Sequence, residues 1–210
     1  MSKREQTRKE EVVNAITHGL GIVFCLIGMP FLLVDSFNEN QWPVFISVLA
    51  FGIGMLAVYT FSTLFHAATN QKIKYLFQIG DHISIYFLIA GTYTPLMVRY
   101  LKPETATVFL GIMWTIVAFG IVFKIFFTQK FRFISVMLYL ALGWMIVFVI
   151  KPLILTMPFS VFLWILIGGM SYTTGVYFYI RDYKYYYHTI WHFFVLFGTV
   201  AHFVSIYLSL

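Results

Sequence analysis

The feature that most constrains this chain is a succession of apolar runs, each long enough to cross a bilayer, separated by short polar breaks. Seven runs qualify: residues 15–34, 42–65, 75–98, 106–123, 133–150, 157–180 and 189–210. A helix needs about 20 mostly apolar residues to span the hydrocarbon core of a membrane. We therefore expect an all-α integral membrane protein, a seven-transmembrane helix bundle that forms one domain over residues 1–210.

The composition agrees with this expectation. Charged residues make up 10% of the chain and hydrophobic residues 60%, whereas about 25% of the residues of a soluble domain are charged. So few charges cannot cover a globular surface, and lipid must be the solvent for most of the chain. The net charge of +6 is no sign of nucleic-acid binding, because the basic residues lie in short clusters between the apolar runs. Cys25 is the only cysteine, which excludes an intramolecular disulfide and a cysteine-based zinc cluster.

The basic residues also predict the orientation of the bundle. Eleven of the 14 Lys and Arg residues fall on the side of the N-terminus, Lys124 among them as a loop residue. The other side receives Arg99, Lys102 and Lys151. Cytoplasmic loops carry the excess of Lys and Arg. The N-terminus is therefore expected in the cytoplasm and the C-terminus outside.

Ionisable side chains inside spanning segments are costly and are candidates for a functional site. Seven of the eight acidic residues fall in the termini or breaks, which leaves Asp81 near the start of the third run. All six histidines lie in the runs or at their edges. The expected topology brings His66, Asp81, His188 and His192 to one depth near the inner leaflet. His202 lies about 20 Å deeper, at about 1.5 Å per residue.

The spacing of these residues is consistent with a metal site. His188 and His192 are four residues apart and project from one helical face, and Ser62 and His66 form a second such pair. Three imidazoles with an open fourth position are a catalytic zinc arrangement, in which bound water has a pKa of about 7. Asp81 could hold that water or shuttle its proton. A pair of histidines can also be hydrogen-bonded packing residues, but the third His and the Asp at the same depth favour a metal.

The other three histidines carry weaker signals. His18 fits either a place beside the metal ligands or a helix cap. His82 points about 100° away from Asp81 along the helix and is expected at the membrane interface. His202 is expected to be a packed, hydrogen-bonded core residue.

Four ordered stretches connect the chain to a known family: Asn14-Ala-Ile-Thr-His18-Gly, Ser62-Thr-Leu-Phe-His66, Asp81-His-Ile-Ser-Ile-Tyr86 with Gly91-Thr-Tyr-Thr-Pro95, and His188-Thr-Ile-Trp-His192. The chain resembles the hemolysin III proteins, the bacterial branch of the progestin and adipoQ receptor family, whose superfamily also contains alkaline ceramidases. The resemblance implies a bacterial plasma-membrane bundle with zinc on His66, His188 and His192. It also implies that Asp81 contacts the zinc-bound water and that Ser62 is the superfamily serine. The long N-terminal region of the animal receptors is absent, so hormone binding is not carried over.

Two functional hypotheses of different class follow. The first is a zinc-dependent lipid amide hydrolase acting on a ceramide-like lipid, with Asp81 as general base and acid and Ser62 orienting the water or the oxyanion. The alternative is a non-enzymatic receptor or membrane-homeostasis protein in which zinc is structural and a lipid, fatty acid or sterol is the ligand. The sequence does not decide whether the protein is an enzyme. A direct pore-forming hemolysin ranks lowest, because the runs show few polar stripes.

Overall fold

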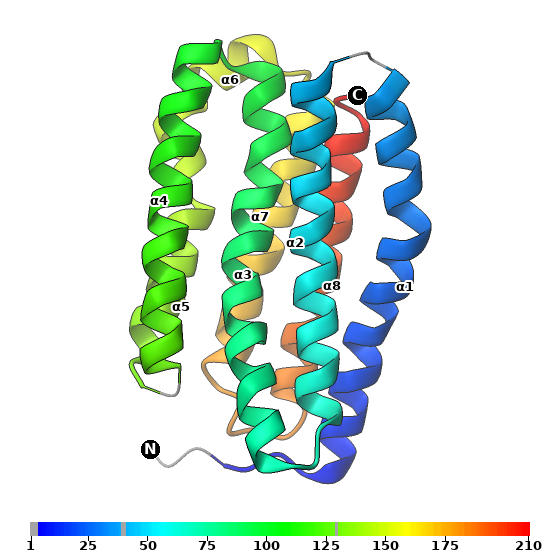
Figure 1. The fold of residues 1–210 in the computed structure, drawn as a ribbon, viewed down its shortest axis with the longest axis vertical. Helices are drawn as coiled ribbons and strands as arrows, with labels where there is room; N and C mark the ends of the chain where they lie inside the picture. Colours follow the sequence, from blue (N-terminus) through cyan, green and yellow to red (C-terminus); the bar gives the residue numbers. More distant parts are fainter. Residues whose placement is uncertain (1–3, 39–40, 129) are drawn as a thin grey trace.

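The computed structural model describes residues 4–38, 41–128 and 130–210, and every regular element within them is a helix (Figure 1). In chain order these are α1 (Arg8–Asn38), α2 (Trp42–Ala67), α3 (Gln71–Tyr100), α4 (Pro103–Phe127), α5 (Arg132–Gly143), the 3₁₀ helix η1 (Met145–Val149), α6 (Ile150–Thr156), α7 (Phe159–Tyr179) and α8 (Tyr187–Tyr207). The long helices run side by side. We call the end at which α1, α3 and α8 begin the lower end, as it is drawn in Figure 1.

Six helical stretches in the described part of the chain are long and apolar enough to cross a membrane: α1, α2, α4, the run from Arg132 to Thr156, α7 and α8. The predicted third span, residues 75–98, is helical but does not meet this test. It lies in α3, which is the least hydrophobic of the long helices because it carries Asp81, His82 and several hydroxyl side chains.

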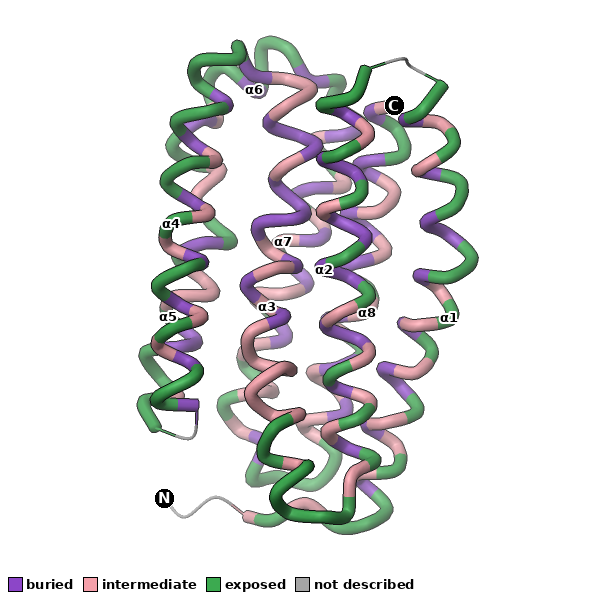
Figure 2. The backbone as a smooth tube through the Cα atoms, in the orientation of Figure 1, coloured by how far each residue is buried: buried purple, intermediate pink, exposed green. Residues whose placement is uncertain are grey.

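The backbone of α3 lies directly against that of α2. A Cβ added at Gly54 would be 2.6 Å from the carbonyl oxygen of Phe87, and one added at Gly91 would be 2.8 Å from that of Ala50. Small residues allow helices to approach closely in membranes, where packing rather than water drives association. The polar helix α3 is thus placed inside the bundle, and Figure 2 shows buried residues along its upper half.

The outer helices present apolar side chains to the surroundings. In the most apolar stretch of α2 and of α8, half of the residues are buried. The corresponding share is 28% for α4 and 22% for the run Arg132–Thr156. Phe119, Phe148 and Leu155 are each more than 70% exposed. Exposed apolar surface on this scale is expected of a bundle whose solvent is lipid.

Helices extend past several of the predicted runs, and two of these extensions change where a charged residue or a proline lies. The fifth run was expected to end before Lys151 and Pro152, but helical structure continues to Thr156 and the break comes at Met157 and Pro158. Pro152 is tolerated in the first turn of α6, where its missing N–H has no intrahelical partner to lose. The fourth run was expected to end at residue 123, but α4 continues to Phe127. Lys124 is therefore a helical residue and not a loop charge.

The start of α1 is fixed by a reciprocal pair of hydrogen bonds. The backbone N–H of Thr7 donates to Oε2 of Glu10 at 2.9 Å, and the N–H of Glu10 donates to Oγ1 of Thr7 at 3.3 Å. This is a capping box, which satisfies the unpaired N–H groups at a helix start. The buried Glu10 also accepts from Arg4 and from the backbone N–H of Tyr186. The N-terminal segment is thereby bound to the α7–α8 loop at the lower end.

Candidate metal centre

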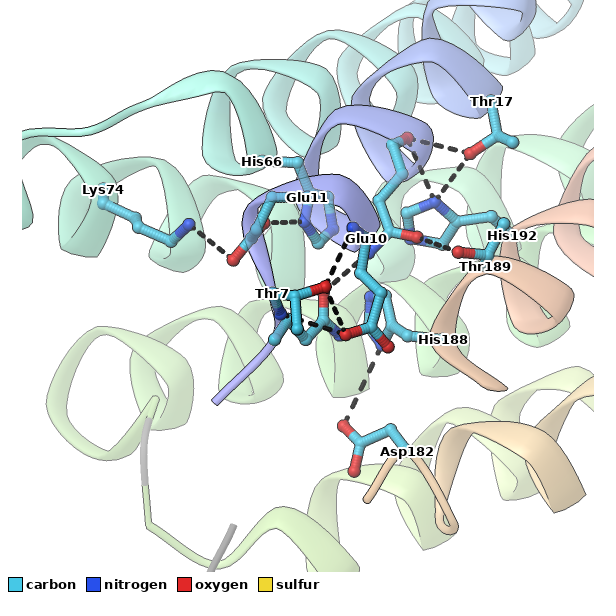
Figure 3. A network of polar contacts seen from close by, with 12 residues as sticks. Thr7, Glu10, Glu11, Thr17, His66, Lys74, Asp182, His188, Thr189 and His192 are labelled. Carbon is cyan, nitrogen blue, oxygen red and sulfur yellow. Dashed lines mark hydrogen bonds and ion pairs between the residues drawn. The ribbon is translucent and has the colours of Figure 1, made fainter. Parts of the chain in front are cut away.

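Three histidines meet at the lower end of the bundle, from the end of α2 and the start of α8. His66, His188 and His192 each offer one ring nitrogen, and the three nitrogens lie within 4.8 Å of one another. The centroids of the rings are 5.1, 5.0 and 4.7 Å apart. His66 and His192 are buried and His188 is partly buried. The one-turn spacing of His188 and His192 turns both rings toward His66, as Figure 3 shows.

His66 is oriented by a carboxylate from α1. Its Nδ1 lies 2.6 Å from Oε2 of Glu11, and Oε1 of Glu11 accepts from Nζ of Lys74 at 2.8 Å (Figure 3). Because Nδ1 faces Glu11, Nε2 is the nitrogen that His66 can offer to a metal. Glu11 lies in the first turns of α1, which begins before the first apolar run.

His192 is oriented by two other groups of α1. Its Nδ1 lies 3.1 Å from Oγ1 of Thr17 and 3.3 Å from the carbonyl oxygen of Asn14. The side chain of Asn14 is itself held, because its Oδ1 accepts from Oγ1 of Thr189 at 2.5 Å and its Nδ2 donates to Gln6 at 2.6 Å. All of these groups except Gln6 are buried. The ring of His192 is therefore fixed between α1 and α8.

His188 faces the α7–α8 loop. Its Nδ1 is 3.9 Å from Oδ2 of Asp182, a longer contact than the other two. Asp182 is buried and is also bound by Arg132, whose two terminal nitrogens lie 3.0 and 2.9 Å from its oxygens. His66 and His192 thus each hold Nδ1 against an oxygen atom of α1, whereas the nearest carboxylate oxygen to Nδ1 of His188 lies beyond hydrogen-bond distance (Figure 3). Metal-binding histidines characteristically present their second nitrogen to a carboxylate or carbonyl in this way.

Ser62 and Asp81 share a cavity with the three histidines. Ser62 lies one turn before His66 and is 1% exposed, and its hydroxyl makes no hydrogen bond within the described residues. Asp81 lines the same cavity from α3 and is partly buried. The cavity has a volume of about 1450 Å³ and extends from the polar lower end along apolar side chains of α3, η1 and α7 as far as His202. The roles of Ser62 and Asp81 in a reaction stay predictions.

The remaining histidines have distinct surroundings. The ring of His18 stacks on that of His192, with centroids 3.6 Å apart and planes at 19°. His18 therefore lies beside the histidine cluster and does not cap a helix. His82 lines the cavity, and its carbonyl oxygen accepts from the hydroxyl of Tyr139 at 2.9 Å. His202 packs in the core against Tyr172, with ring centroids 5.4 Å apart.

The sequence analysis missed the oxygen partners of the histidines: Glu11, Asn14, Thr17 and Asp182. For Glu11 and Asn14, the spacing along the sequence could have indicated that they lie near the histidines. Glu11, Asn14 and His18 follow at i, i+3 and i+7, which places them on one face of α1. The buried partners of a functional residue can therefore lie just outside an apolar run.

The fold and the cluster define a class: helical multi-pass membrane proteins with a group of three largely buried histidines beside a large cavity between the helices. The comparison with protein families narrows this class. Residues 6–203 match the model of the family described as "Haemolysin-III related". The chain belongs to this family.

Individual relatives agree with this assignment. The chain is 40% identical to the hemolysin-3 homolog of Bacillus subtilis over 201 residues, which cover 95% of this chain and 94% of the relative. It is 36% identical to hemolysin-3 of Bacillus cereus over 206 residues, covering 98% and 94%. It is also 27% identical to the human monocyte to macrophage differentiation factor over 205 residues, covering 94% and 83%.

Proposed function

We propose that the protein is a zinc-dependent hydrolase that cleaves the acyl amide of a ceramide-like lipid within the plasma membrane. The observation that carries the proposal is the cluster of three histidines, in which Nδ1 of His66 and of His192 is held by an oxygen atom. The cluster stands at the polar end of a largely apolar cavity. A cavity of this form accepts acyl chains and leaves the amide at the polar end.

The residues present fit zinc. Three imidazoles, two of them oriented through the second nitrogen, are the ligand set of catalytic zinc sites that keep a position open. When bound, zinc would polarise the acyl carbonyl and make water more acidic. His66, His188 and His192 would hold the ion.

Asp81 and Ser62 supply the remaining chemistry. Asp81 would accept a proton from the attacking water and return it to the amine when the carbon–nitrogen bond breaks, so that the products are a carboxylic acid and an amine. The hydroxyl of Ser62 would donate a hydrogen bond to the oxygen atom that gains negative charge on the acyl carbon. The burial of Ser62 favours this role, because a hydrogen bond is stronger where water is excluded.

Elemental analysis and lipid turnover by the purified protein test the proposal together. We expect zinc in the wild-type protein and release of fatty acid from ceramide. The variant Asp81→Asn should retain zinc and lose turnover, and His188→Ala with His192→Ala should lose both. Glu104→Gln, an exposed change at the opposite end of the bundle, is the matched control. A fully zinc-loaded protein that hydrolyses neither ceramide nor another acyl-amide lipid contradicts the proposal.

A structural role for zinc in a non-enzymatic receptor or membrane-homeostasis protein is the second candidate. It is favoured by contacts of the cluster with α1 and with the α7–α8 loop, since a bound ion would tie these elements to α2 and α8. In that case removal of the histidines lowers thermal stability and the biological effect together, and Asp81→Asn leaves both unchanged. In the enzyme, Asp81→Asn abolishes the effect at unchanged stability.

We further propose that α3 is the seventh span and that the N-terminus is cytoplasmic, which the distribution of Lys and Arg favours. Single cysteines test this in a Cys25→Ala background. A membrane-impermeant maleimide should label Lys102→Cys on intact cells and Glu5→Cys only after lysis. The reverse pattern, or equal labelling of both, refutes the topology.

A further inference from the structure

Lys124 is buried in a place where a lysine ordinarily reaches water. It lies one turn before the end of α4, is 2% exposed and lines the internal cavity, while its neighbours Ile125 and Phe126 are exposed. A lysine near the end of a spanning helix usually extends to the interface. Its ammonium has three donors, yet among the described residues it makes no hydrogen bond and no close ion pair. A buried cation is costly unless it is paired.

Thr128 adds a second donor at the same place. It follows Lys124 by one turn, is 3% exposed and also lines the cavity. Its Oγ1 is buried without a hydrogen-bond partner within the described part of the chain. The ring of Tyr139 closes one side, with its centroid 6.0 Å from Nζ of Lys124. An ammonium and a hydroxyl on one face of α4 therefore face the cavity together.

The surrounding charges leave Lys124 available to an anion. Arg132, at the start of α5, is bound by both oxygens of Asp182 and by the carbonyl oxygen of Tyr179. Asp81 is the acidic group that acts on Lys124. The lining of the cavity holds five basic side chains and four acidic ones, so that one positive charge is left over within it.

We propose that Lys124 and Thr128 bind the phosphate group of an acyl lipid whose chains occupy the apolar part of the cavity. A phosphate offers several acceptor oxygens to an ammonium and a hydroxyl, and basic pockets between helices near a membrane face bind lipid phosphates. Leu88, Ile146 and Ile165 line the cavity where the chains would lie. This is a statement about lipid binding, and it does not rest on the proposed hydrolysis.

Calorimetric titration of the purified protein with short-chain lipids tests the site. The probes are dioctanoyl phosphatidic acid, dioctanoylglycerol with the same chains and no phosphate, and inorganic phosphate with no chains. The variants are Lys124→Met, Thr128→Val and, as the matched control, Lys130→Met at an exposed lysine of the same hairpin. Each variant is measured both in the wild-type background and in combination with His188→Ala and His192→Ala. This comparison separates lipid binding at Lys124 from metal binding and hydrolysis.

Lys124→Met should lower the affinity for phosphatidic acid at least tenfold, about 1.4 kcal/mol. The affinity of this variant for dioctanoylglycerol should stay within twofold of the wild-type value. Thr128→Val should lower the affinity for phosphatidic acid about threefold, and Lys130→Met should leave the affinity for both lipids unchanged. The dependence on Lys124 should persist in the histidine double variant even if that protein has no activity. Equal phosphatidic acid affinity in Lys124→Met and Lys130→Met overturns the proposal, as does a parallel loss of dioctanoylglycerol. Inorganic phosphate that binds as tightly as phosphatidic acid overturns the lipid part and identifies a site for the free ion.

Discussion

The contact between Glu11 and His66 offers a sharp test of the metal centre, because it alters a ligand without touching the ion. The substitution Glu11→Gln keeps the size of the side chain and an acceptor oxygen for Nδ1 of His66. It removes the negative charge that lies 2.6 Å from that nitrogen and 2.8 Å from Nζ of Lys74. The imidazole then becomes a weaker donor to a metal.

The structure sets the size of the effect. Loss of an outer partner of a metal ligand costs about 10–100-fold in metal affinity. Glu11→Gln should fall at the lower end, about tenfold or 1.4 kcal/mol, because the amide oxygen still accepts and because Lys74 already offsets part of the charge. Glu11→Ala removes the acceptor altogether and should approach 100-fold.

The zinc affinity of both variants can be measured in detergent by competition with a zinc chelator of known affinity. Glu104→Gln, an exposed carboxylate at the upper end of the bundle, is the control and should match the wild-type protein. Thermal unfolding of the zinc-free proteins separates an effect on the metal from an effect on the fold. If both Glu11 variants bind zinc within twofold of wild type, the reasoning that His66 is a ligand oriented by Glu11 is refuted.

Three further outcomes are expected. Gly91→Ala should destabilise the protein by about 1–3 kcal/mol in thermal unfolding, since its Cβ meets the α2 backbone, while Gly111→Ala, which has open space around it, should not. Glu10→Gln should cost about 1–3 kcal/mol and expose the N-terminal segment to limited proteolysis, because the buried carboxylate accepts from Arg4, Thr7 and Tyr186. His18→Phe, which keeps a flat ring against His192, should retain zinc affinity within about threefold, whereas His18→Ala should lower it more.

Much of the fold followed from the lengths of the apolar runs, since a bilayer imposes one length on every helix that crosses it. Six of the seven runs fall in helical stretches that are long and apolar enough to cross a membrane, but the limits of these runs were less accurate than their positions. The run that ends at residue 150 continues as helix to Thr156, because a proline early in a helix does not end it. The third run lies in α3, whose polar side chains lower its hydropathy. This helix nevertheless lies at the centre of the bundle.

The histidines were the accessible part of the site. His66, His188 and His192 stand out because apolar sequence surrounds them, and topology alone suffices to bring them to one end of the bundle. Their oxygen partners did not stand out. Glu11 and Asp182 lie in charged segments at the edges of the spans, where a carboxylate is usually solvated. Only the packing of α1 against α2, and of the α7–α8 loop against α8, reveals their contacts.

Lys124 was not predicted to belong to the site. Its helix α4 continues beyond the predicted run that ends at residue 123, and Lys124 is buried near the end of that helix. Glu10 and Asp182 are also buried, although both belong to charged segments at the edges of the apolar runs. A charge buried at headgroup depth can be paired within the protein and still meet a lipid headgroup from the same bilayer. The lower end thus combines a histidine cluster, a buried lysine and a largely apolar cavity, and the two proposals, hydrolysis of a lipid amide and binding of a lipid phosphate, rest on these three features.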